Sequence, residues 1–159
     1  MPLTRFHAKL AIPPCVIGIR TEGTSVAQIA FLPPDEAELS PQNALAEQAA
    51  AQIVGYVADA DFRFRLPLLV GGTAFQRRVW DQISAIGPGK TRTYGELAAA
   101  LSSAARAVGQ ACGANALPLV VPCHRVVAAA GLGGFAHHDR GYLPRVKRWL
   151  LDHESGSCT

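Results

Sequence analysis

Apolar and polar residues alternate along the first part of the chain in a way that is typical of short β-strands. The alternating runs FHAKLAI, VIGIRT and VAQIAFL occupy residues 6–12, 16–21 and 26–32. Pro13-Pro14 separates the first two runs, and a polar turn at residues 22–25 separates the second from the third. Because Gly, Pro, Ser and Thr at such positions favour tight turns, the pattern predicts a small antiparallel sheet.

A helix and then an extended segment are predicted after the sheet. Ser40 is a residue type that caps helices, and Pro41 is suited to a first helical position, so we expect a helix from there to about residue 59. Residues 63–72 have the pattern of extended chain and linker. We therefore expect two domains, a sheet-and-helix domain at residues 1–70 and a second domain at residues 71–159.

The second domain is predicted to be mainly helical. Thr73 with Gln76, and Thr93 with Glu96, have the spacing of capping boxes, which mark helix starts. The first of these helices presents one apolar face, formed by Phe75, Val79, Ile83 and Ile86. Further helices are expected at residues 104–115 and from Pro144 onward.

Two short helices joined by the polar turn Ser102-Ser103 resemble a helix-turn-helix. The second one consists almost entirely of Ala, Gly and Val around Arg106. Small side chains permit close approach either to another helix or to a nucleic-acid groove. The helix pattern leaves both interpretations open.

Composition and charge place the chain among ordinary globular proteins. Of its 159 residues, 49% are hydrophobic and 17% are charged. The sequence contains no apolar run of the ~20 residues that a membrane helix needs, and its start lacks the layout of a signal peptide, so we expect a cytoplasmic protein.

The basic residues are concentrated in the second half of the chain. Residues 73–159 hold ten basic and five acidic residues, against five and seven in residues 1–72. The basic half suggests a polyanionic partner, although a merely solvated surface has the same composition.

The cysteines suggest reactive chemistry more than cross-linking. Cys15, Cys112, Cys123 and Cys158 form no CxxC pair, which argues against a disulfide framework and a zinc site. His137-His138 have no third ligand at a useful spacing, so no metal and no cofactor are expected.

The stretch VVPCHRVV, residues 120–127, holds the candidate nucleophile. Cationic neighbours lower the pKa of a thiol, so Cys123 beside His124 and Arg125 is a candidate thiolate, although a buried core cysteine at a strand end is the alternative. Side chains next to each other in a strand point to opposite faces, so His124 would act through a water. Glu154 is the best candidate for the acid that orients the imidazole, with a solvated carboxylate as the alternative.

Motifs in the second half resemble those of one known family. GTAFQRRVW, TYGELA, AARAVGQA, Asn115, VPCHRVV and KRWLLDHE occur in the order seen in the methylated-DNA–protein-cysteine methyltransferases, or O6-alkylguanine-DNA alkyltransferases. The resemblance runs from about residue 72 to residue 154 and implies an α+β fold. In that fold a small ribonuclease-H-like antiparallel sheet domain precedes a helical domain with a helix-turn-helix.

The resemblance implies DNA repair by one irreversible transfer of an alkyl group from O6-alkylguanine to a cysteine, with O4-alkylthymine as a further candidate substrate. The resemblance also implies that a monomer binds duplex DNA through the minor groove and flips the damaged nucleotide out of the duplex. The catalytic residues implied are Cys123 as acceptor, His124 as base through a water, Glu154 in the relay and Tyr94 as proton donor. Arg106 would fill the gap left by the flipped nucleotide, with Thr93, Ala107, Gly109 and Gln110 also contacting DNA. Hinge and pocket roles fall to Asn115, Pro118, Val126, Phe135 and Ala136.

The sequence departs from the family pattern at residues 133–144, where GGFAHHDRGYLP replaces the usual glycine-rich loop. Ala136 lacks the hydroxyl that a serine there would offer to the guanine oxygen. Two other functions remain open. One is a lesion sensor that grips alkylated DNA without transfer, and the other is a thiol hydrolase that uses Cys123, His124 and Glu154 and turns over.

Overall fold

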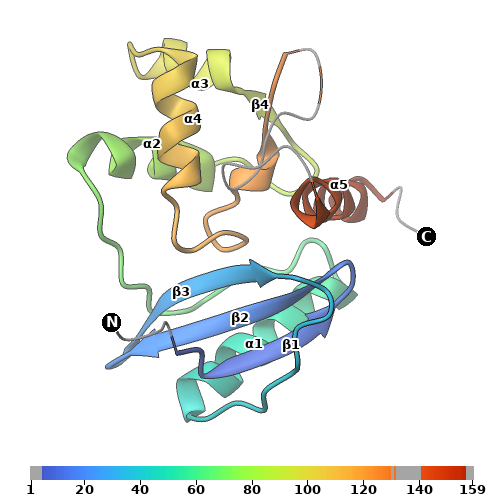
Figure 1. The fold of residues 1–159 in the computed structure, drawn as a ribbon. Coiled ribbons are helices and arrows are strands. Elements are labelled where there is room, and N and C mark those ends of the chain that lie inside the picture. The colour runs from blue at the N-terminus through green and yellow to red at the C-terminus, as the bar shows by residue number, and fades with distance from the viewer. Residues whose placement is uncertain (1–4, 130, 132–140, 157–159) are drawn as a thin grey trace. The chain divides into compact units, whose positions relative to one another are not determined.

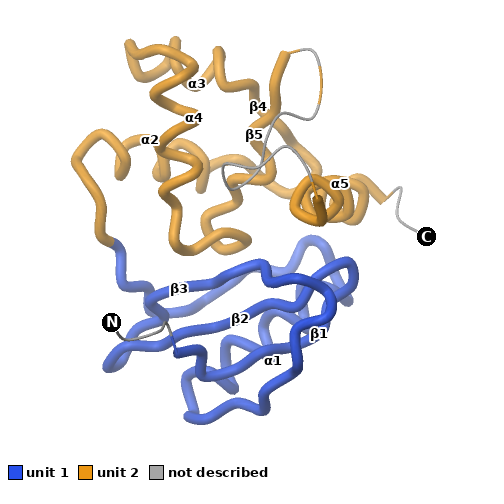
Figure 2. Tube along the Cα trace, in the orientation of Figure 1, with its two compact units in different colours: residues 1–70 blue, residues 71–159 orange. Residues whose placement is uncertain are grey.

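A computed structural model of the chain describes residues 5–129, 131 and 141–156. The chain divides into two compact units, residues 1–70 and 71–159, which Figure 2 shows in different colours. No helix within the described segments combines the length and the hydrophobicity that crossing a membrane requires. Each unit has its own buried core.

The first unit is built on an antiparallel sheet with the strand order β1-β2-β3. Its strands are β1 (Ala8–Ile12), β2 (Cys15–Glu22) and β3 (Ser25–Leu32). In the register of the sheet, Ile17 of β2 lies between Leu10 of β1 and Phe31 of β3. The alternating runs of the sequence therefore correctly predict these strands.

Helix α1 (Ala44–Ala58) lies along one face of this sheet, as Figure 1 shows. Ala46, Ala49, Ile53 and Tyr56 are buried on the inward side of the helix. The predicted start at Ser40-Pro41 is wrong, because Asn43 is the N-cap and its Oδ1 accepts a hydrogen bond from the backbone of Ala46 at 2.8 Å. Residues 39–42 are instead extended chain that is bound to the first strand. Leu39 forms a β-bridge with Lys9 of β1, and the Gln42 amide donates to the carbonyl of His7, the residue just before β1.

The segment after α1 is more than a linker. The Val26 amide donates to the Pro67 carbonyl at 2.8 Å, and the Leu69 amide donates to the Val26 carbonyl at 2.9 Å. These bonds attach the extended chain to β3 as a parallel bridge at Leu68.

The second unit is mainly helical. Its elements are α2 (Ala74–Ser84), β4 (Arg92–Thr93), α3 (Tyr94–Ala100), α4 (Ala105–Gly113), the 3-10 turn η1 (Cys123–Arg125), β5 (Val126–Val127) and α5 (Tyr142–Ser155). Both predicted capping boxes are confirmed, one at Thr73 with Gln76 and one at Thr93 with Glu96. They fix the starts of α2 and α3 because each pair satisfies two backbone amides.

Helix α4 packs against both α2 and α3. The core between these helices contains the fully buried side chains of Val79, Ile83, Leu97 and Val108. The last helix begins two residues before the predicted Pro144, because Gly141 adopts a left-handed φ of 79° and turns the chain into α5. Proline is tolerated in a first helical turn, where its missing amide has no partner to lose.

We expect Asn43→Ala to destabilise the protein by ~1 kcal/mol, because the substitution removes the cap of α1. Ser40→Ala is the matched control, since Ser40 is exposed and lies outside the helix. Urea denaturation followed by far-ultraviolet circular dichroism measures both changes. A larger loss for Ser40→Ala than for Asn43→Ala would contradict the assignment of the cap.

Candidate active site

Cys123, His124 and Arg125 form a 3-10 turn and not the strand end that the sequence suggested. All three side chains are buried. Strand β5 follows the turn directly and pairs in parallel with β4, with Arg92 opposite Val126 and Thr93 opposite Val127. This pairing brings the start of α3 beside the end of the turn.

Asn115 binds the acceptor candidate and the segment leading to it. Its Nδ2 donates to the Val121 carbonyl at 2.9 Å and to the Cys123 Sγ at 3.1 Å. Its Oδ1 accepts from the Leu117 amide at 2.9 Å. Since Asn115 lies just after α4, one amide side chain ties the end of that helix to the Cys123 turn.

His124 and Glu154 lie in direct contact. The distance from His124 Nε2 to Glu154 Oε2 is 2.7 Å, and the two side chains are 0% and 1% exposed. Glu154 is therefore not the solvated carboxylate that the sequence left open. It also accepts two hydrogen bonds from Arg125, at 2.8 and 2.9 Å, in a bidentate pair.

The contact with Glu154 selects the tautomer of His124. An ionised carboxylate can only accept hydrogen bonds, so Nε2 carries the hydrogen and Nδ1 has a free lone pair. Nδ1 is buried and has no hydrogen-bond partner among the residues that the structure describes. Burial lowers the pKa of His124 against the opposing effect of Glu154, so the ring is neutral at rest and able to accept a proton.

The Arg125 guanidinium holds this arrangement in place. Its Nη1 donates to the Ile86 carbonyl at 2.6 Å, just beyond the end of α2.

Gly89 approaches α5 so closely that a Cβ there would lie 3.1 Å from the Glu154 carbonyl oxygen, and its φ of 75° also requires glycine.

Cys123 is protonated at rest. A hydrogen bond with the Cys112 thiol and burial raise its pKa well above the usual range, while Asn115 and Lys147 act in the opposite direction. The transfer of a group to this sulfur therefore requires a base to take its proton.

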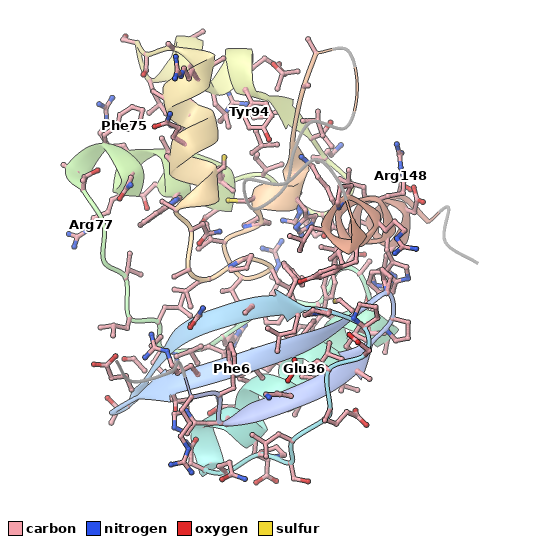
Figure 3. The ribbon with its side chains drawn as sticks, viewed as in Figure 1. Phe6, Glu36, Phe75, Arg77, Tyr94 and Arg148 are labelled. Carbon is pink, nitrogen blue, oxygen red and sulfur yellow. The ribbon has the colours of Figure 1, made fainter. Side chains whose placement is uncertain are left out.

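Tyr94 and Lys147 lie on the other side of the site. The Tyr94 ring packs against α4 next to Gly109, and Figure 3 shows this side chain beside the helix. Burial, with a smaller contribution from Cys112 and Cys123, raises the pKa of Tyr94 to about 12, so its hydroxyl keeps its proton. Lys147 Nζ lies 5.7 Å from the centroid of the Tyr94 ring and donates to the Val126 carbonyl at 2.7 Å.

The residues expected to contact DNA lie on α3 and α4. Arg106 and Gln110 are exposed on α4, with the half-buried Ala107 and Gly109 on the same helix. Thr93 caps α3 through its contact with the Glu96 amide. Cys123, Asn115 and Tyr94 thus lie on or beside the helix pair that carries Arg106.

Comparison with known proteins identifies the family. The model of the 6-O-methylguanine DNA methyltransferase DNA-binding domain matches residues 74–156, which is more than half of the chain. The chain belongs to this family. The resemblance read from the sequence motifs is confirmed.

Individual relatives agree with the family match. A methylated-DNA–protein-cysteine methyltransferase of Salmonella typhimurium is 46% identical over 113 residues, which cover 69% of this chain and 61% of that protein. The chain thus spans less than two thirds of that relative. The crystal structure of the Mycobacterium tuberculosis O6-methylguanine methyltransferase is 30% identical, with a TM-score of 0.78, and the match covers 98% of this chain and 96% of that one. The same protein has been solved in complex with DNA, and that structure matches with a TM-score of 0.77 at 31% identity, over 94% of this chain and 93% of that one.

The family comparison also confirms the predicted fold class, a small antiparallel sheet combined with helices. Of the expected pocket residues, Val126 is fully buried. Pro118 is half-buried and forms an isolated β-bridge with Val121. Phe135 and Ala136 lie outside the described residues, as do His137 and His138. Within the described parts of the chain, no group of three or more His, Cys, Asp or Glu side chains is placed to hold a metal ion.

Sequence reasoning missed two residues of this site. Lys147 belongs to the apolar stripe of α5 with Leu143, Val146 and Leu150, and a lysine inside such a stripe is a signal of a functional or paired charge. Burial lowers the pKa of Lys147 to about 8. Cys112 lies four residues after the buried Val108 on α4, a spacing that places both on one helix face.

We expect Glu154→Gln to destabilise the second unit by ~3 kcal/mol, since it removes the counter-charge of the buried Arg125. Asp81→Asn is the control, because Asp81 is exposed on α2 in the same unit, so its substitution should change the stability by no more than ~0.5 kcal/mol. Both tryptophans, Trp80 and Trp149, lie in residues 71–159, so their fluorescence in a denaturant titration reports on this unit. Equal effects of the two substitutions would contradict the proposed importance of the buried pair.

Proposed function

We propose that this protein repairs DNA by moving the alkyl group of O6-alkylguanine onto Cys123, as a single-turnover methylated-DNA–protein-cysteine methyltransferase. The observation that carries the proposal is the buried set of contacts around the turn. Asn115 binds the Cys123 sulfur at 3.1 Å, and His124 binds Glu154 at 2.7 Å with its second nitrogen unpaired among the described residues. The membership in the O6-methylguanine methyltransferase family supports the same reaction.

In this reaction the thiol proton passes from Cys123 to His124 Nδ1 through a bridging water. The Cys123 thiolate then attacks the alkyl carbon, a sulfur–carbon bond forms, and the bond from that carbon to guanine O6 breaks. Glu154 stabilises the imidazolium that forms, because its carboxylate already accepts a hydrogen bond from Nε2. The product is a thioether, which is a stable bond at sulfur, so each protein molecule would react once.

Tyr94 would supply the proton that the leaving guanine needs. Its raised pKa keeps the hydroxyl protonated, and β4 places the residue at the start of α3, beside β5. Lys147 lies beside the Tyr94 ring, and its charge favours the thiolate form of Cys123. Together these groups can offset the negative charge that develops on the base.

Arg106 would enter the duplex and occupy the space of the flipped nucleotide. O6 of guanine is inaccessible to a buried thiol while the base is stacked, so flipping is required. Arg106 is exposed near the start of α4, and the small Ala107 and Gly109 permit that helix to approach the DNA closely. We infer binding through the minor groove, with Thr93 and Gln110 as further contacts and with Asn115 as the hinge between this helix and the active site.

Residues 71–159 would act as the DNA-binding and alkyl-acceptor domain and residues 1–70 as the supporting domain. Pro118 and Val126 would line the base pocket. We propose that the protein acts as a monomer, and O4-alkylthymine is a second substrate to test.

We expect stoichiometric transfer of label when the protein is incubated with duplex DNA that carries one radiolabelled O6-methylguanine. Label should reach one equivalent per protein and should be absent in Cys123→Ser, because only the thiolate can accept the alkyl group. Tight binding without label would favour a lesion sensor instead. Label that is released over many turnovers would favour a thiol hydrolase, and either result would overturn the proposal.

We expect Arg106→Ala to slow transfer from duplex DNA by roughly tenfold or more, since the cost of flipping is a few kcal/mol. Transfer from free O6-benzylguanine should change little, because a free base needs no flipping. Arg148→Ala is the matched control, since it removes the same charge from an exposed position on α5. Equal losses on duplex and on free base would rule out the finger role of Arg106.

A further inference from the structure

Trp80 of α2 holds the last turn of α4 through a buried hydrogen bond. Its indole Nε1 donates to the Ala111 carbonyl at 2.9 Å, and the two residues are 9% and 3% exposed. The last carbonyls of a helix have no partner amide within the helix. The amide four residues after Ala111 belongs to Asn115 and donates to the Cys112 carbonyl instead, at 3.2 Å. The Trp80 side chain thus supplies the partner that the helix itself does not provide for Ala111.

The position of the indole ring is closely defined by the chain that precedes α2. A Cβ at Gly72 would lie 2.6 Å from the ring carbon Cη2 of Trp80, so the backbone of this glycine lies directly against the ring. Arg77 Nε donates to the Gly71 carbonyl at 3.1 Å and thereby binds the same segment to α2. Because the ring has so little room beside this backbone, packing fixes the direction in which its N–H points.

The last turn of α4 also provides contacts to the acceptor sulfur. The Cys112 carbonyl, next to Ala111, lies 3.7 Å from the Cys123 Sγ. Asn115, four residues after Ala111, donates from Nδ2 to the same sulfur at 3.1 Å. Both contacts therefore come from residues within four positions of the carbonyl that Trp80 binds, so a shift of this turn would change both distances.

Of these two contacts, the one from Asn115 matters most for the reaction. A carbonyl can only accept, so the Cys112 contact is available to the protonated thiol and not to the thiolate. The Asn115 amide is a donor, and a hydrogen bond to a charged acceptor is roughly twice as strong as one between neutral groups. The position of Asn115 is thus most important when Cys123 carries its negative charge.

We propose that Trp80 is a positioning residue for alkyl transfer, whose hydrogen bond to the Ala111 carbonyl keeps Asn115 in donor contact with the Cys123 sulfur. Trp80 gives up no proton and forms no covalent bond, and it acts through Asn115. This inference rests on the proposed function for the identity of the reaction.

The test measures the rate of methyl transfer in a single turnover, at saturating duplex DNA that carries one radiolabelled O6-methylguanine. The proteins compared are the wild type, Trp80→Phe, Asn115→Ala and the double variant. Trp80→Phe keeps an aromatic ring but lacks the donor, and we expect it to slow transfer by roughly three- to tenfold, up to the effect of one hydrogen bond to a charged group. Its dissociation constant for undamaged duplex should not change, since the exposed Arg106 and Gln110 are unaltered.

The double variant shows whether Trp80 acts through Asn115. Once Asn115→Ala has removed the donor to Cys123, the further change Trp80→Phe should slow transfer by less than ~twofold, because residues that act through one contact are not additive. A residue that only stabilised the fold would not produce this dependence at a temperature where circular dichroism shows every variant to be folded.

Two further proteins separate the hydrogen bond from ring packing. Trp149→Phe is the matched control, since Trp149 is half-buried on α5 and stacks on His153, and it should transfer at the wild-type rate. Benzothienylalanine at position 80 keeps both rings and replaces the N–H by sulfur, so it should slow transfer as Trp80→Phe does. This second variant also decides the question if Trp80→Phe does not fold.

Several outcomes would overturn this inference. Wild-type rates in both position-80 variants mean that the hydrogen bond has no role in transfer. Slow transfer with phenylalanine but not with benzothienylalanine means that ring size matters, and full additivity with Asn115→Ala means that Trp80 acts by another route. Transfer by the wild type with unchanged variants removes only the role of Trp80, whereas a wild type that transfers no label removes the proposed function as well.

Discussion

The buried carboxylate of Glu154 is the interaction on which the C-terminal unit depends. It accepts hydrogen bonds from His124 and Arg125, and Arg125 in turn donates to the Ile86 carbonyl. The last helix, the Cys123 turn and the end of α2 are thereby joined through a few charged groups. A buried charge without such partners would be costly, so the same contacts that orient the His124 ring also stabilise the packing of these elements.

The electrostatic balance of the site follows from this pair. Glu154 and Arg125 largely neutralise each other, and among the residues that the structure describes Lys147 is the cation that acts on the two thiols. Lys147 is fully buried and donates to the Val126 carbonyl, so it stays close to the sulfur atoms and to Tyr94. In the proposed reaction, one charge of fixed position would favour the thiolate before transfer and would stabilise the departing base afterwards.

Features set by near neighbours could be predicted from the sequence, and features set by distant contacts could not. Both capping boxes were predictable because each joins residues three apart. The cap of α1 was not, since Ser40 and Asn43 are both good caps and the choice depends on pairing between Leu39 and Lys9. The family motifs named most of the candidate site, but the burial of Glu154 depends on tertiary packing.

Helix α4 confirms the helix-packing interpretation of its small residues and leaves its other side available for the proposed DNA contact. Its inward side packs against α2 and α3 through the buried Val108 and Ala111, which is the helix-packing interpretation. Its other side carries the exposed Arg106, and Gly109 leaves room for the Tyr94 ring. A Cβ at residue 109 would lie 4.0 Å from that ring, which is an ordinary van der Waals contact, so the ring of the candidate proton donor lies directly beside this side of the helix. The inward side of α4 therefore provides the packing, and its other side carries the residues of the proposed chemistry.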